Sequence, residues 1–443
     1  MIGITQPRRV AAVSMARRVA HELQLSNNHV SHQIRYDATT SPHTQIKFMT
    51  DGVLLRELAQ DLTLAKYSIV IVDEAHERSV NTDVLIGMLS RVVKLREKRW
   101  IDAKEKGMDA PRPLRLVIMS ATLRVNDFTK NSMLFSTPPP VVHIGARQHP
   151  VTIHFNRRTV QDYVTEAIKK TSKIHTRLPP GGILLFMTGQ QEVQTVCRKL
   201  SQRYGADALS KYTIEAVKPA MSTRIAEPEA EEMDLGTAED LDVDDDLDNE
   251  VQEDEEALDS DDESLPLAES DTPMHILPLY SLLPSSEQQR VFEDPPESTR
   301  LVVVATNVAE TSITIPNIKY VVDCGRAKER QIDPRSQVQS YDISWISKAS
   351  AAQRAGRAGR TGPGHCYRLY SSALYEELFH DFSVPEILRT PVDGLVLQMK
   401  AMNIDNVANF PFPTPPNRSA LIGSEPMLVH LGGLESSDAV SRS

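Results

Sequence analysis

Short apolar runs alternate with amphipathic stretches along most of the chain. In the first 120 residues the runs are continuous and rich in β-branched residues, which is typical of strands buried on both faces. The stretches between them carry apolar residues at helical spacing. This order predicts a parallel sheet. We expect strands at Ile2–Thr5, Gln45–Thr50, Tyr67–Val72 and Leu114–Met119, and helices at Val10–Leu23, Gly52–Gln60 and Asn81–Leu95.

The same order recurs in the second half. Strands are expected at Gly182–Thr188, Ile276–Tyr280, Leu301–Thr306 and Ile318–Asp323, and helices at Glu192–Tyr204 and Ala349–Ala355. The chain therefore reads as two α/β layers in tandem, joined near Arg147–Pro150. A Leu- and Met-rich stretch, Val384–Met402, has helical character, and a proline cluster and a Ser-rich end follow it.

Charge is distributed unevenly. The net charge is −11, but the 45 residues from Glu227 to Asp271 hold 23 Asp and Glu and no Lys or Arg. The other 398 residues carry 49 Lys and Arg against 37 Asp and Glu. Such a basic body suits a polyanionic partner, although ordinary solvated surfaces give a similar balance. The low aromatic content of the acidic insert, 225–272, and the repulsion between its like charges prevent it from burying enough surface to offset its ordering entropy, so we predict that it is disordered.

Two classes of protein are excluded by the sequence. The three cysteines, Cys197, Cys324 and Cys366, lie far apart and form no Cys-x-x-Cys pair, so neither a zinc knuckle nor a disulfide framework is indicated. No apolar run approaches the roughly 20 residues that a bilayer requires. We expect no membrane partner.

Asp73-Glu74-Ala75-His76 follows the expected strand Tyr67–Val72. Ligands of open parallel sheets bind at the carboxyl ends of strands, so two adjacent carboxylates there suit a hydrated Mg²⁺ and the activation of a water. The alternative is an ordinary polar loop after a strand.

A second cluster, Gln353 to Arg360, repeats arginine at every third residue as QRAGRAGR. Arginine supplies permanently charged, bidentate donors to a γ-phosphate, and the small residues between allow phosphate to approach the backbone. Glutamine can orient the attacking water. The alternative is a basic helix face that binds any anion.

Seven blocks in this order resemble the DEAH-box RNA helicases. They are TQPRRVAA (Thr5–Ala12), TDG (Thr50–Gly52), DEAH (Asp73–His76), SAT (Ser120–Thr122), LLFMTGQ (Leu184–Gln190), ATNVAETSITI (Ala305–Ile315) and QRAGRAGR (Gln353–Arg360). The resemblance implies an α/β fold of two tandem RecA-like domains, followed by the start of a winged-helix domain at LRTPVDGLVLQMKAMNI. It implies ATP or another nucleoside triphosphate, with Mg²⁺, as cofactors.

The resemblance also implies catalytic roles. Asp73 would hold the Mg²⁺ through water, with Glu74 beside it as the general base toward the lytic water. Gln353 would position that water, while Arg357 and Arg360 would stabilise charge on the γ-phosphate from the opposite domain.

Nucleotide binding and coupling are implied in the same way. His76, with Ser120 and Thr122, would couple the nucleotide to the RNA surface. Arg18 matches the position whose guanidinium stacks on the base. The family often has an aromatic residue after Asp-x-Gly on the other face of the base, and this chain has Arg326 there.

Backbone amides and hydroxyls at strand ends and helix starts suit the recognition of phosphate and 2′-OH groups. For each such residue alone, a helix cap is an equally good interpretation. The family pattern favours RNA contacts at Arg8, Arg9, Arg35, Thr50, Thr306, Asn307 and Thr311.

The sequence contains no Gly-Lys-Ser or Gly-Lys-Thr. In the family this phosphate loop precedes TQPRRVAA, so we expect an N-terminally truncated chain that also stops inside the winged-helix region. The expected domains are a RecA-like domain 1 at 1–148 without its phosphate loop, a RecA-like domain 2 at 149–375 that contains the insert, and a partial winged-helix region and tail at 376–443.

Within the family, the acidic insert and LPLYSLLPSSEQQRVF resemble the nucleolar branch that acts in ribosome biogenesis. This implies pre-ribosomal or small nucleolar RNA and a protein activator as partners, and a nucleolar location. Three hypotheses remain: an ATP-dependent RNA helicase, a non-catalytic RNA-binding fragment of one, and a DNA helicase of the same superfamily. A 2′-OH contact would distinguish RNA from DNA.

Overall fold

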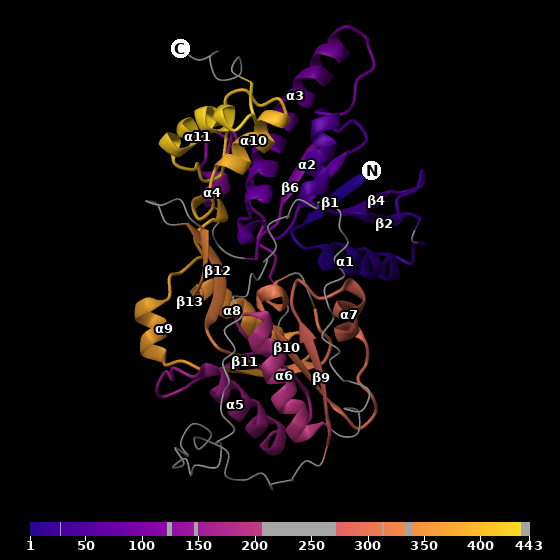
Figure 1. The fold of residues 1–443 in the computed structure, drawn as a ribbon. Coiled ribbons are helices and arrows are strands. Elements are labelled where there is room, and N and C mark those ends of the chain that lie inside the picture. Colours follow the sequence, from indigo (N-terminus) through magenta and orange to yellow (C-terminus); the bar gives the residue numbers. More distant parts are fainter. Residues whose placement is uncertain are drawn as a thin grey trace. The chain divides into compact units, whose positions relative to one another are not determined.

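The computed structural model describes residues 1–26, 28–121, 126–145, 149–205, 272–311, 314–332 and 339–435. The chain forms two compact units. Unit 1 comprises Met1–Gly145, Glu329–Asp342 and Ser383–Ser443, and unit 2 comprises Ala146–Lys328 and Ile343–Phe382. Each unit is built around its own sheet (Figure 1).

The sheet of unit 1 has the strand order β3-β2-β4-β1-β5-β6, and all its neighbouring pairs are parallel except β2 and β3. Its strands are β1 (Ile2–Gln6), β2 (Val30–Ile34), β3 (Asp37–Ala38), β4 (Ile46–Thr50), β5 (Ile69–Val72) and β6 (Arg115–Ile118). Its helices are α1 (Arg9–Glu22), α2 (Asp51–Gln60), α3 (Val80–Glu105) and α4 (Asn126–Thr129).

The sheet of unit 2 is parallel throughout, in the order β7-β14-β11-β8-β10-β9. Its strands are β7 (Val151–Phe155), β8 (Gly182–Phe186), β9 (Met274–Leu279), β10 (Arg300–Ala305), β11 (Ile318–Asp323) and β14 (Gly364–Arg368). The helices are α5 (Tyr163–Arg177), α6 (Gln190–Tyr204), α7 (Ser285–Gln289), α8 (Lys348–Gly356) and α9 (Ser372–Leu378). A separate pair of strands is formed by β12 (Arg326–Ile332) and β13 (Gln339–Trp345).

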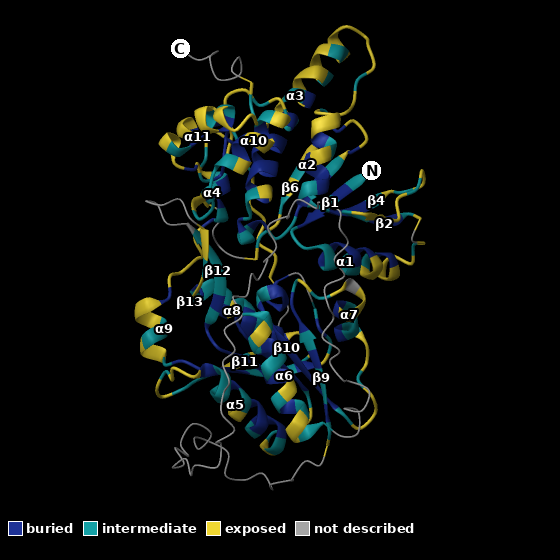
Figure 2. Ribbon diagram, viewed as in Figure 1, coloured by how far each residue is buried: buried dark blue, intermediate teal, exposed yellow. Residues whose placement is uncertain are grey.

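The central strands of unit 2 are buried along their whole length, as Figure 2 shows for β10. Every residue of β8 and β10 is buried. This explains why both strands read as unbroken apolar runs in the sequence, since neither face meets water.

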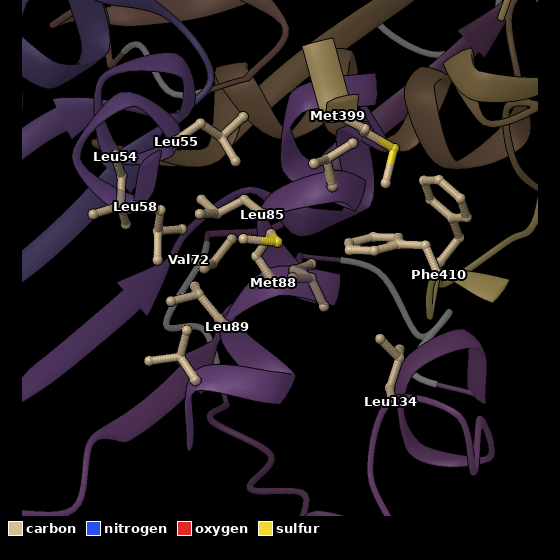
Figure 3. Packing of buried hydrophobic residues seen from close by; sticks show 14 of the residues in the cluster. Leu54, Leu55, Leu58, Val72, Leu85, Met88, Leu89, Leu134, Met399 and Phe410 are labelled. Carbon is tan, nitrogen blue, oxygen red and sulfur yellow. The ribbon is translucent and has the colours of Figure 1, made fainter. Parts of the chain in front are cut away.

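The part of unit 1 from Ser383 to Glu435, here called the C-terminal segment, contains α10 (Asp393–Ala401) and α11 (Arg418–His430). Two short 3₁₀ turns, Glu386–Leu388 and Val407–Asn409, precede α10 and α11 respectively. Its apolar side chains belong to the same core as those of α2 and α3. Figure 3 shows Met399 and Phe410 of this segment beside Leu85 and Met88 of α3.

The expected architecture of two parallel sheets is confirmed, and so are the strands on which the sequence analysis placed its motifs. One expectation was wrong: Val384–Met402 is not one helix, because α10 begins only at Asp393. Pro391 lies between the 3₁₀ turn and α10; it lacks an amide hydrogen and disfavours helical geometry in the residue before it. The insert 225–272 lies outside the described residues apart from Thr272, as do the first two residues of the expected joint at 147–150. Within the described residues, no helix is both long and apolar enough to cross a bilayer.

Candidate functional site

The DEAH block forms a tight turn at the carboxyl end of β5. The Asp73 carboxylate accepts hydrogen bonds from Gln6 Nε2 at 2.7 Å and from the Glu74 amide at 2.8 Å. Gln6 ends β1, the neighbouring parallel strand, so the sheet itself brings these two side chains together. Glu74 has a left-handed backbone with φ 54° and ψ 31°, a conformation that costs free energy for any residue other than glycine.

His76 connects this turn to the SAT block. Its Nδ1 accepts a hydrogen bond from the Ala121 amide at 3.1 Å, and its Nε2 lies 3.3 Å from Glu74 Oε2. An imidazole that accepts at Nδ1 carries its proton on Nε2, toward the carboxylate. The structure therefore joins Glu74, His76 and Ala121 in one row. Ser120 precedes Ala121, whereas Thr122 lies outside the described residues.

The expected RNA residues of unit 1 lie at the starts of helices. Arg8 directly precedes α1 and Thr50 directly precedes α2, and within the described residues neither side chain caps its helix. The capping alternative is therefore not supported for Thr50. Arg8 Nε instead lies 3.5 Å from Glu77 Oε1, which connects the TQPRRVAA block to the DEAH turn. Arg9 is the first residue of α1.

Arg35 and Arg18 lie on other parts of unit 1. The Arg35 guanidinium lies 5.0 Å from the centre of the Tyr36 ring, and Tyr36 is 86% exposed at the turn between β2 and β3. Arg18 lies on the exposed face of α1, where its Nε donates to Glu22 Oε1 at 2.7 Å. This pair spans one turn of a helix, so it does not by itself fix a base-binding position.

In unit 2 the arginine cluster begins in α8, continues through the 3₁₀ turn Arg357–Gly359 and ends at Arg360 directly after that turn. Its first arginine, Arg354, is 0% exposed. Arg354 Nε donates to Glu310 Oε2 at 3.0 Å and Nη1 donates to Asp323 Oδ1 at 2.8 Å. Burial opposes the charge of Arg354, but the carboxylates of Asp323 and Glu310 outweigh it and raise the pKa of the guanidinium.

Arg354 was not among the predicted site residues, and it holds together three blocks of unit 2. Glu310 comes from ATNVAETSITI and Asp323 ends β11. Because arginine recurs at every third residue, the sequence does not show that Arg354 is buried whereas Arg360 is exposed. Glu310 in the neighbouring block was the available signal, because a buried arginine requires an acidic partner.

The other members of the cluster are more accessible or differently paired. Arg360 is exposed, and its Nη1 donates to Thr314 Oγ1 at 2.6 Å. Arg357 is mostly buried and Gln353 is half-buried. One small residue of the cluster has a packing reason: a Cβ on Gly359 would lie 2.6 Å from the carbonyl oxygen of His149. The sequence analysis explained these small residues only by the approach of a phosphate to the backbone.

Arg326 stacks within the protein. Its guanidinium lies 4.6 Å from the Tyr163 ring centre and 4.5 Å from that of Trp345. Its carbonyl oxygen accepts from Arg354 Nη1 at 3.2 Å. Contact between Arg326 and a nucleotide base therefore stays a prediction, and it requires the side chain to leave these two rings.

Thr306, Asn307 and Thr311 lie at the 3₁₀ turn Asn307–Ala309 after β10. Thr306 precedes this turn, Asn307 begins it and Thr311 follows it by two residues. Thr306 and Thr311 are 1% and 4% exposed, so their side chains point into unit 2. An RNA contact at Thr306 would have to come from its backbone.

The chain is similar to known helicases. The family model described as "Helicase conserved C-terminal domain" matches residues 251–362. "Probable ATP-dependent RNA helicase DHR1" of Saccharomyces cerevisiae is 52% identical over 459 residues, covering 100% of this chain and 36% of that protein. "Probable ATP-dependent RNA helicase DHX37" of Homo sapiens is 50% identical over 466 residues, covering 98% of this chain and 39% of that protein.

The fold matches as well. The crystal structure of the Escherichia coli DEAH/RHA helicase HrpB aligns with a TM-score of 0.72 and 27% identity, covering 100% of this chain and 46% of that one. The chain belongs to the DEAH-box RNA helicase family. It spans less than half the length of these relatives.

Proposed function

We propose that this chain is part of an ATP-dependent RNA helicase, which hydrolyses a nucleoside triphosphate and couples hydrolysis to movement along RNA. The observation that carries the proposal is the DEAH turn. There the parallel sheet of unit 1 places the Asp73 carboxylate beside Gln6 and the Glu74 carboxylate beside His76. His76 connects the turn to the SAT block, which gives hydrolysis a route to the rest of the unit.

The residues divide the chemistry between them. Glu74 accepts the proton of the lytic water as general base. Gln353 positions that water, and Arg357 and Arg360 stabilise charge that develops on the γ-phosphate. His76, Ser120 and Thr122 transmit the state of the nucleotide, and Arg18 and Arg326 are the proposed base contacts.

The Asp73 carboxylate fits a hydrated Mg²⁺. Two hydrogen-bond donors fix its orientation, and an ionised carboxylate has further lone pairs for metal-bound water. Among the described residues there is no cluster of three or more His, Cys, Asp and Glu that could hold a metal. Mg²⁺ usually keeps several waters and takes phosphate ligands, so one carboxylate with Glu74 beside it suffices as the protein's share. When bound, the ion would neutralise phosphate charge.

RNA is the proposed substrate. The contacts proposed for it are backbone, hydroxyl and guanidinium groups at helix starts, at the turn between β2 and β3 and after β10, which recognise phosphate and ribose rather than base sequence. They are Arg8, Arg9, Arg35, Thr50, Thr306, Asn307 and Thr311.

The proposed biological role is ribosomal RNA processing and small-subunit biogenesis in the nucleolus. It is supported by the 23 carboxylates between Glu227 and Asp271 and by the sequence LPLYSLLPSSEQQRVF. Pre-ribosomal or small nucleolar RNA and a protein activator are the proposed partners.

The test is Glu74→Gln in a version extended upstream to carry a phosphate loop. This change keeps the shape of the side chain and removes its basicity, so turnover is abolished while nucleotide binding stays within about twofold. Glu105→Gln, at the exposed end of α3, is the matched control and leaves both unchanged. Normal turnover in Glu74→Gln contradicts the role of Glu74.

A second candidate is an RNA-binding protein without turnover. The absence of Gly-Lys-Ser and Gly-Lys-Thr from all 443 residues favours it. RNA binding by the chain, with no ATP hydrolysis in either the short or the extended form, would support this candidate over the first.

A further inference from the structure

Arg78 lies two residues beyond the DEAH block and is 2% exposed. Its Nε and Nη2 donate to Asp83 Oδ1 and Oδ2, each at 2.9 Å. This is a bidentate pair, the strongest arrangement between a guanidinium and a carboxylate. Asp83 lies in the first turn of α3, so the pair fixes the end of the DEAH turn onto that helix.

The other donors of the same guanidinium reach two distant segments. Nη1 donates to Asp127 in α4, the helix that follows the SAT block. Nη2 also donates to Thr414 Oγ1 at 2.6 Å, across 336 positions of sequence. Arg78 therefore connects the DEAH turn, the region after SAT and the C-terminal segment through one side chain.

The backbone from Arg78 to Val80 makes a second connection to the C-terminal segment. The Glu386 amide donates to the Arg78 carbonyl oxygen at 3.1 Å, and the Val80 amide donates to Glu386 Oε2 at 2.9 Å. The backbone just before Thr414 is also hydrogen-bonded to unit 1. Asn131 Nδ2 donates to the carbonyl oxygens of Phe412 and Pro413, directly before Thr414.

The backbone conformation of the DEAH turn depends on contacts with its surroundings. Glu74 and Arg78 are both left-handed, with φ 54° and 55°, and the 3₁₀ turn Ala75–Glu77 lies between them. Two left-handed residues that are not glycine require outside contacts to persist. Arg78 supplies these contacts at one end, and a change in its partners alters the turn that carries Glu74 and His76.

We propose that Arg78 is a positioning residue that couples the DEAH turn to the C-terminal segment through Thr414, so that movement of the segment changes the geometry of Glu74 and His76. The functional side of this inference rests on the proposed function. The coupling itself is a property of unit 1 and is measurable without turnover.

The first test is hydrogen–deuterium exchange on the 443-residue chain. Thr414→Val keeps the shape of the side chain and removes only the acceptor for Arg78. We expect amide exchange in residues 74–78 to rise about tenfold, the effect of losing one hydrogen bond to a charged group. Ser424→Ala is the matched control: its buried hydroxyl donates to Ala420 within α11, and its loss leaves residues 74–78 unchanged.

Two outcomes overturn the proposal. One is faster exchange at the amides of positions 410, 412 and 414 in Thr414→Val with no change in residues 74–78. The other is an equal change in residues 74–78 for both variants, which indicates general loosening of unit 1.

The second test is turnover in the upstream-extended version. Thr414→Val is expected to lower kcat about fivefold with the KM for ATP unchanged, because it disturbs the positions of Glu74 and His76 and removes no nucleotide contact. A rise in KM with kcat unchanged contradicts the positioning role. If the extended protein with the natural sequence shows no turnover, the proposed function fails, and the exchange experiment still decides the coupling.

Discussion

The Nδ1 atom of His76 accepts a hydrogen bond from the backbone amide of Ala121 at 3.1 Å, which ties the DEAH turn to the SAT block. His76→Ala removes this bond and the 3.3 Å contact of Nε2 with Glu74 Oε2, and it leaves both hydrogen bonds of the Asp73 carboxylate in place. In the upstream-extended version we expect the ratio of RNA-stimulated to basal ATP hydrolysis to fall about tenfold, as for the loss of one hydrogen bond of about 1.4 kcal/mol. Hydrolysis with and without RNA measures it. His29→Ala, at an exposed hydrogen bond to Ser26, serves as control; an unchanged ratio in His76→Ala argues against the coupling.

Arg354→Ala should destabilise unit 2 strongly. It leaves the buried carboxylates of Asp323 and Glu310 without their cation, which costs about 3–5 kcal/mol. Arg360→Ala, at an exposed position, should cost less than about 1 kcal/mol. Denaturant unfolding followed by the fluorescence of Trp345, the tryptophan of unit 2, measures both. Similar midpoints for the two variants would show that Arg354 is not structural; if Arg354→Ala is insoluble, Arg354→Lys should give an intermediate midpoint.

Unit 2 should lose stability in mild acid. Burial lowers the pKa of four of its histidines, His154, His175, His275 and His365; neighbouring Arg300 adds to this at His175, and Lys319 at His365. The unfolded chain titrates near pH 6.5, so it binds more protons than the fold below that pH. The stabilisation is therefore complete above about pH 6.5 and is lost as pH falls toward the lower folded values.

His154 is the clearest contributor to this dependence. Its Nε2 lies 3.2 Å from His365 Nδ1, where only one proton can be shared. Unfolding midpoints from Trp345 fluorescence between pH 7.5 and 5 should fall, and His154→Gln should reduce the slope. A slope that is flat, or is unchanged in the variant, contradicts this account.

Unit 1 contains a group with the opposite dependence. Burial raises the pKa of Asp51 to about 6, above its unfolded value, so its contribution is largest in acid and is lost as pH rises through 6. Trp100 reports on this unit. We expect its unfolding midpoint to change less with acid than that of Trp345; a larger fall at Trp100 would be inconsistent with the raised pKa of Asp51.

Gly87→Ala should push the C-terminal segment away from α3. A Cβ at this position would lie 2.7 Å from the carbonyl oxygen of Pro411 and against the Phe410 ring. We expect a loss of about 1–3 kcal/mol from the unfolding free energy of unit 1, since overpacking costs this much. Gly423→Ala in α11 meets nothing within 4 Å and should instead stabilise the helix by up to about 1 kcal/mol. Denaturant unfolding followed by Trp100 fluorescence compares the unfolding free energies of the two variants. Equal changes would show that the contact of the C-terminal segment with α3 does not contribute to the stability of unit 1.

The central strands and the DEAH turn were predictable from the sequence because burial on both faces leaves an unbroken apolar run. The edge strand β7, with sequence VTIHF, was missed because its partly exposed faces weaken that signal. The contacts of Arg354 and Arg78 could not be derived. Sequence spacing does not show which arginine of a cluster turns inward, or that Arg78 meets both Asp83 and Asp127, which lie 44 residues apart in sequence. The proline cluster near Thr414 gave no hint that it packs on α3 and bonds to Asn131, because prolines predict only where helices stop.

RNA-stimulated ATP hydrolysis, measured for the 443-residue chain beside the upstream-extended version, tests the central claim most directly. The account predicts turnover in the extended form, with more stimulation by RNA than by DNA of the same sequence, and none in the short chain. Turnover by the short chain would contradict the account of the site, because phosphate would then be held without a Gly-Lys-Ser or Gly-Lys-Thr loop. No turnover in the extended form would contradict the helicase proposal itself.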